Sequence, residues 1–97
     1  MIRHIALLTF VPGTTDEQVG VLEEAMSHLP ERLPKIRSYK YGRDVGLNEG
    51  QASFAVVADF DNVADYVEYR DDTEHRRIVS ALIAPILASR TATQYEI

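Results

Sequence analysis

Short apolar runs alternate with amphipathic stretches along this chain. The run at residues 2–11 ends at a Pro-Gly pair, and its length together with this turn signal predicts a strand. Residues 52–60 form a second apolar run of the same kind. The more polar segments 36–45 and 90–97 alternate with a period of two residues. They predict two further strands, and the weakly apolar face of 36–45 is typical of a strand at a sheet edge.

Two amphipathic segments lie between the strands and predict helices. Either Thr14 or Thr15 can cap the first helix, because Glu17 or Gln18 follows three positions later and completes a capping box. The apolar stripe of this helix has helical spacing and consists of Val19, Leu22, Met26 and Leu29.

The second helical segment is predicted in two pieces. Asp61 or Asn62 caps the first piece, and a polar break follows at residues 70–72. Thr73 can cap the second piece, which Pro85 should end or kink. The buried side of the second piece is expected to carry Ile78, Val79, Leu82, Ile83 and Ile86.

The order of these elements is β-α-β-β-α-β, which predicts one α+β domain over residues 1–97. The expected architecture is ferredoxin-like, with a four-stranded antiparallel sheet. The first and third strands then lie at its centre, and both helical segments cover the same face. The other face would meet water in a monomer and should be polar.

The two central strands are instead apolar on both faces. On the first strand one face carries Ile2, Ala6, Leu8 and Phe10 and the other Ile5, Leu7 and Val11, while the third strand carries Phe54, Val56, Ala58 and Phe60 opposite Ala55 and Val57. An uncovered face of this kind is rare in monomers. We therefore expect two copies to pack sheet against sheet as a homodimeric α+β barrel. Any chemistry should lie on the helix-covered face, which one chain builds alone.

Composition narrows the possible functions. The net charge of −5 and the absence of a basic cluster argue against binding to nucleic acid or to an anionic membrane. The chain has no cysteine, which excludes disulfides and thiolate chemistry, and no apolar run long enough to span a membrane. We expect a cytoplasmic protein. Its glycines form no nucleotide-binding motif and its histidines show no metal-ligand spacing, so neither cofactor nor metal is predicted.

Three residues are candidates for chemistry, and each has a structural alternative. His4 interrupts an apolar strand, so it is either a hydrogen-bonded structural histidine or a polar group lining a cavity. His75 falls in the first turn of a helix, where it is either exposed or a neutral, base-competent imidazole. Tyr69 either packs in the core with Tyr66 or turns its hydroxyl into a pocket. We interpret Tyr39 and Tyr41, with Arg37 and Arg43, as an edge-strand face or part of the dimer contact.

Several short segments, in this order, carry a resemblance to a known family. They are Ile2-Arg3-His4-Ile5 with Phe10 and Pro12-Gly13-Thr14-Thr15, then Tyr41-Gly42-Arg43-Asp44-Val45-Gly46, then Ala58-Asp59-Phe60-Asp61, then Tyr69 followed by His75. Together they resemble the stress-responsive α/β barrel family, abbreviated Dabb, over the whole chain. The resemblance implies a homodimeric α+β barrel. Many bacterial members have no assigned activity, plant members are linked to stress responses, and a few relatives are cofactor-free polyketide cyclases.

The resemblance leaves two functional hypotheses. In the first, the homodimer binds a small apolar or aromatic ligand without converting it, in a cavity walled by Phe10, Phe54, Leu82 and Ile86. In the second, the protein is a cofactor-independent polyketide cyclase or lyase. The cyclase relatives imply roles for three matching positions: His75 would be the general base, Tyr69 would bind or protonate the oxyanion, and His4 would orient the pair.

Overall fold

The computed structural model describes residues 1–97 as a single antiparallel sheet with helices on one face. Its elements in chain order are β1 (Ile2–Phe10), α1 (Asp16–Ser27), α2 (Leu29–Arg32), β2 (Ser38–Arg43), β3 (Phe54–Phe60), α3 (Val63–Asp71), α4 (Thr73–Ile78), the π-helical turn η1 (Val79–Ile83), the 3₁₀ turn η2 (Ala84–Ile86) and β4 (Leu87–Glu96). The strand order is β2-β3-β1-β4. This order confirms the predicted ferredoxin-like fold, with the first and third strands at the centre.

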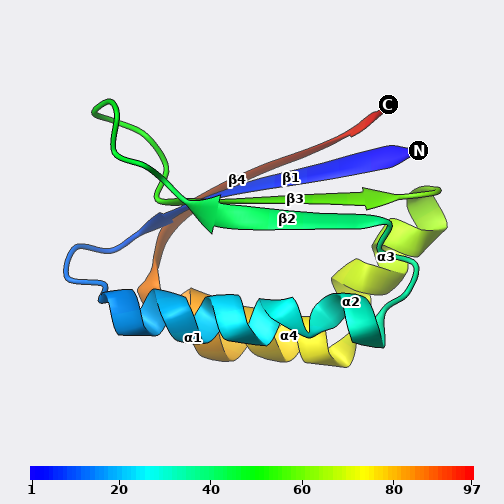
Figure 1. Cartoon of the computed structure of the whole chain (residues 1–97), viewed down its shortest axis with the longest axis horizontal. Coiled ribbons are helices and arrows are strands. Elements are labelled where there is room, and N and C mark those ends of the chain that lie inside the picture. The colour runs from blue at the N-terminus through cyan, green and yellow to red at the C-terminus, as the bar shows by residue number, and fades with distance from the viewer.

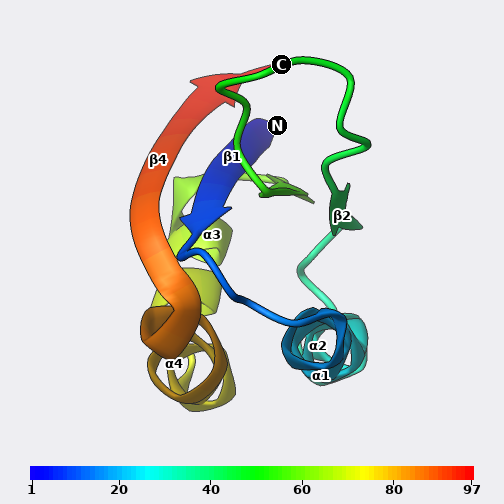
Figure 2. The ribbon, with the colours of Figure 1, turned by 90° about the vertical axis from the view of Figure 1, so that its left-hand side faces the viewer.

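The helices and the sheet form two layers. Figure 1 shows the helices together below the sheet, and Figure 2 shows α1 with α2 lying beside α4. In the sheet, His4 of β1 pairs with Ala58 of β3 on one side and with Gln94 of β4 on the other. Because side chains alternate along a strand, the even-numbered residues of β1 all face the helices.

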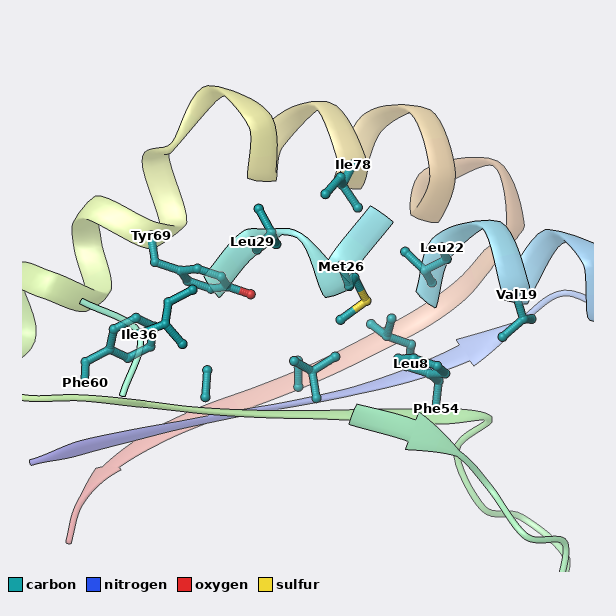
Figure 3. Close-up of a cluster of buried hydrophobic side chains, with 13 residues drawn as sticks. Leu8, Val19, Leu22, Met26, Leu29, Ile36, Phe54, Phe60, Tyr69 and Ile78 are labelled. Atoms are coloured by element: carbon teal, nitrogen blue, oxygen red, sulfur yellow. The ribbon is translucent and has the colours of Figure 1, made fainter. Parts of the chain in front are cut away.

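The core forms where α1 meets the central strands. Thr15 is the N-cap of α1, and its hydroxyl and the Gln18 side chain form the reciprocal bonds of a capping box. The apolar face of the helix is buried against β1 and β3, as Figure 3 shows. Removing this much apolar surface from water is the main stabilising contribution to the fold.

Asp72, rather than Thr73, is the N-cap of α4. One carboxylate oxygen of Asp72 accepts hydrogen bonds from the backbone N–H groups of Glu74 and His75, each at 3.0 Å. The same carboxylate pairs with Arg32 of α2 at 3.1 Å. The predicted cap was thus one position too late, because an aspartate can satisfy two free N–H groups and a cation together. Asn62 caps α3.

The helical segment after α4 widens before it ends. The N–H of Ala84 bonds to the carbonyl of Val79, five residues earlier, which defines the π turn η1. Pro85 then lies in η2, and β4 follows at Leu87, three residues before the predicted start of this strand. Pro85 therefore ends the helix as expected, since it has no N–H to continue the ladder.

The opposite face of the sheet carries apolar side chains without a cover in one chain. Leu7 is 40% exposed, and Ile5 and Val57 are only partly buried. Arg3 and Asp59 form an ion pair across β1 and β3, with Nε and Oδ1 2.8 Å apart. Apart from that pair, the exposed surface of the two central strands matches the apolar pattern expected from the sequence.

Candidate functional site

A cavity of about 820 Å³ lies between the sheet and the helices. Ala6, Leu8 and Val56 of the sheet form its floor, while Met26 and Ile78 of the helices face them. This volume is within the range of about 300–1,000 Å³ that small-molecule sites occupy. The residues of the floor lie on the face of the sheet that the helices cover (Figure 3).

His4, Tyr69 and His75 all line this cavity, although they come from three separate elements. Tyr69 lies in the last turn of α3 and His75 in the first turn of α4, and the break at Asp72 between the two helices brings the side chains together. Their ring centroids are 4.2 Å apart with an interplanar angle of 36°. The ring of His4 lies 6.1 Å from that of Tyr69. The structure therefore brings the three candidates together, which leaves their roles open.

The backbone fixes the neutral tautomer of His75. Its Nδ1 lies 3.3 Å from the carbonyl oxygen of Arg70, and since a carbonyl only accepts, Nδ1 must carry the proton. The neutral ring then has its lone pair on Nε2, which is the atom able to accept a proton. Burial is the main cause that lowers the pKa of His75, against opposing effects of the Arg70 carbonyl and of Asp72. Burial thus favours the neutral form of His75 that the sequence led us to expect.

His4 is buried, with 4% of its surface exposed. The amide nitrogen of Gln94 donates to its Nδ1 at 2.8 Å, which places the proton of the neutral ring on Nε2. Burial, followed by the charge of Arg90, lowers the pKa of His4 to about 4. His4 therefore satisfies both interpretations of the sequence, because it has a structural hydrogen bond and also lines the cavity.

A pair of tyrosine hydroxyl groups lies beside these imidazoles. The hydroxyl oxygens of Tyr69 and Tyr39 are 3.1 Å apart. Burial raises the pKa of Tyr69 to about 12, and it raises the pKa of Tyr39 further. Both phenols are thus neutral hydrogen-bond donors near pH 7. Figure 3 shows the hydroxyl of Tyr69 pointing into the interior on the side of Met26.

The four residues predicted to wall the cavity lie outside its lining. Phe54 and Ile86 are buried core residues, and Phe10 and Leu82 pack against that core. Phe10 and Phe54 contact each other, with ring centroids 6.0 Å apart, toward the end of β1 far from His4. This placement corrects the prediction, because the helix α1 fills the space over this end of the sheet and leaves the cavity at the other.

Sequence reasoning missed three polar residues that complete the site: Tyr39, Arg90 and Gln94. Tyr39 does lie on the edge strand β2, as one of its two interpretations expected, and it also lines the cavity. Tyr41 also faces the helices and Arg43 pairs with Glu23 of α1. The alternation along β2 and β4 does place Tyr39, Arg90 and Gln94 on the helix-covered face. No local pattern around Arg90 indicates that its side chain reaches the cavity.

No group of three or more His, Cys, Asp or Glu side chains gathers into a metal-binding arrangement. None of the helices has both the length and the apolar character needed to cross a membrane.

Comparison with known proteins assigns the chain to a family. The profile of the Dabb family, the stress responsive A/B barrel domain, matches residues 2–97. The chain belongs to the Dabb family. A search of curated proteins finds no match for this Dabb chain.

Solved structures share the fold of this Dabb domain over nearly its full length. A dimeric ferredoxin-like protein of unknown function from Thermobifida fusca is 41% identical, with a TM-score of 0.90, covering 99% of this chain and 90% of that one. A dimeric protein of unknown function from Bacteroides fragilis is 27% identical, with a TM-score of 0.83 and coverage of 99% and 95%. The hydroxynitrile lyase of Passiflora edulis is 18% identical, with a TM-score of 0.85 and coverage of 99% and 92%, and shares the fold.

Proposed function

We propose that this Dabb protein is a homodimer in which each subunit binds one small, mainly apolar or aromatic molecule in the cavity between sheet and helices. The observation that carries the proposal is the cavity itself: most of its lining is apolar, and a few polar side chains, among them Tyr69 and His75, lie within it. Small-molecule sites generally combine these features, because apolar walls provide affinity and a few polar groups fix orientation.

Dimerisation through the open face of the sheet is part of this proposal. The partly exposed apolar side chains of Ile5, Leu7 and Val57 favour contact with a second sheet. The Thermobifida and Bacteroides proteins, which are described as dimeric, support the same assembly here. A two-fold contact would place this patch against itself.

A neutral fluorescent probe, N-phenyl-1-naphthylamine, tests binding to the cavity. Two exposed alanines provide matched variants, because Ala84 lines the cavity and Ala81 does not. We expect the wild type to bind the probe, A84W to lose most of that binding by filling the space, and A81W to retain it. Equal binding by both variants, or no binding by the wild type, would contradict the proposed ligand site.

A cofactor-independent lyase or cyclase is the second candidate, and the arrangement of His75 with Tyr69 favours it. Nε2 of His75 is free to take a proton from a carbon next to a carbonyl group. The electron pair of that C–H bond then moves onto the carbonyl oxygen, where the hydroxyl of Tyr69 donates a hydrogen bond. In a cyclase, the resulting enolate carbon attacks a second carbonyl, and the new alkoxide recovers the proton from His75. His4 bonds to Gln94 instead, so its part would be to shape this end of the cavity.

Product analysis with poly-β-keto substrates distinguishes the two candidates. If the protein is a cyclase, wild-type protein should form product, H75A should abolish turnover, and Y69F should reduce it while preserving the packing of the ring. Unchanged turnover in H75A would exclude this mechanism. A bound molecule recovered unaltered from the purified wild type would favour the binding function.

A further inference from the structure

The lining of the cavity carries charge of only one sign. The chain has 15 acidic residues against 10 lysines and arginines. Among the 20 residues around the cavity, however, there are no aspartates or glutamates and four arginines: Arg70, Arg76, Arg77 and Arg90. An acidic protein that gathers only cationic side chains around its main cavity creates a local positive potential there, which attracts anions.

Two of these four arginines have no carboxylate partner. Arg70 pairs with Asp71 and Arg77 pairs with Glu74, with N–O distances of 2.9 and 2.6 Å. Arg76 and Arg90 form neither an ion pair nor a side-chain hydrogen bond, although most other cations of the chain are paired. The paired ones outside the cavity are Arg3, Arg32, Lys35, Arg37 and Arg43. The guanidinium groups of Arg76 and Arg90 are therefore free to bind a ligand.

Arg90 has the better position of the two. It lies directly opposite Leu8 in the pairing of β1 with β4, so it shares the helix-covered face with His4 and Leu8. Its charge also acts on the other polar groups of the cavity: after burial, Arg90 is the next cause that lowers the pKa of His4, and it has a smaller effect of the same sign on the pKa of His75. Arg90 thus lies within electrostatic range of these two histidines, beside an apolar floor.

We infer that the cavity selects a small apolar molecule that carries a carboxylate, and that Arg90 binds the carboxylate. This inference rests on the ligand site proposed above and names the class of ligand. A guanidinium group can donate two parallel hydrogen bonds to a carboxylate, and such charge-assisted bonds are stronger than neutral ones. The apolar part of the ligand then lies over Leu8 and Ile78, and Arg76 adds a second positive charge at the cavity.

Calorimetric titration of 3-phenylpropionate and its uncharged amide, 3-phenylpropionamide, tests the inference. The two molecules have nearly the same shape, so their difference in affinity reports the charge. We expect the acid to bind wild-type protein at least about tenfold more tightly, which corresponds to about 1.4 kcal/mol. R90Q should remove this preference and R90K should retain part of it. R37Q makes the same change of net charge outside the cavity and should keep the full preference.

The outcomes separate this inference from the ligand site on which it rests. If the amide binds wild type as tightly as the acid, the carboxylate inference fails and the apolar site stands. A preference that persists in folded R90Q would also overturn the role of Arg90. If neither compound nor the neutral fluorescent probe binds, the ligand site itself is wrong. Should R90Q fail to fold, as seen by circular dichroism, R90K and the acid-to-amide ratio of the wild type still decide.

Discussion

Replacing His4 with asparagine should make the protein less sensitive to mild acid. In the folded protein the neutral imidazole of His4 accepts a hydrogen bond from Gln94 through Nδ1. Protonation would remove that acceptor and place a charge on a buried ring. The amide oxygen of an asparagine can take the place of Nδ1 and accept the same bond, yet it has no proton to gain between pH 7 and pH 4.

The size of the effect follows from the difference in pKa between the unfolded and the folded chain. The pKa of His4 falls from 6.5 to about 4 on folding. Between these values the unfolded chain binds a proton at His4 and the folded chain does not, so the free energy of unfolding decreases as the pH falls through this window. A tenfold change in proton affinity corresponds to about 1.36 kcal/mol. The contribution of His4 to the free energy of unfolding of wild type should therefore fall by about 2.5 kcal/mol between about pH 7.5 and pH 4.5.

Urea unfolding of wild type and H4N at both pH values, followed by circular dichroism at one protein concentration, measures this difference. Contributions from other groups, including the partly buried His75, are common to both proteins and cancel in the comparison. H28N is the matched control, because His28 is exposed on the surface and bonds to Glu24. It should lose stability with acid to the same extent as wild type.

The reasoning would be refuted if H4N and wild type lost the same free energy of unfolding between the two pH values. That result would mean that the imidazole of His4 is already protonated in the folded protein, or that water reaches it freely. A loss in wild type that is smaller than in H4N would show that the direction of the pKa change is wrong.

Three further predictions concern stability and assembly. D72A should lower the free energy of unfolding by about 1–2 kcal/mol in urea, because two N–H groups of α4 lose their acceptor, and T73A should cost less if Asp72 is the true cap. F54A should cost about 3–5 kcal/mol in the same assay through the cavity it leaves in the core, and a loss under about 1 kcal/mol would contradict this packing. L7E should yield monomers in sedimentation velocity at micromolar concentration, whereas a persisting dimer would place the interface elsewhere.

The order of elements and the sheet could be predicted because both depend on local periodicity. Alternation along β1 and β3 determines which residues face the helices, and the β-α-β-β-α-β order leaves few topologies. The N-cap of α4 was predicted at Thr73, one residue too late, because the role of Asp72 also depends on Arg32, which lies 40 positions earlier in the chain. Such a distant partner is invisible to a local pattern.

The location of the cavity along the sheet could not be predicted for a similar reason. The sequence shows that Phe10 and Phe54 face the helices, but it does not show where α1 crosses the sheet. In the structure, α1 packs in the same core as Phe54, and Val79 and Ile83 of η1 line the cavity together with His4 and Leu8. Arg90 presents the same difficulty, because the meaning of one charged residue on β4 depends on which side chains surround it in space.

The cavity and the open face of the sheet both depend on the pairing register of β1. His4 and Leu8 line the cavity, while Ile5 and Leu7 lie on the open face. A slip of β1 by one residue against β3 and β4 would exchange the two sets, because a shift of one position reverses the direction of every side chain along a strand. Such a change would turn the imidazole outward and place isoleucine and leucine in the cavity at once. Libraries that vary β1 should therefore use substitutions and keep its length fixed.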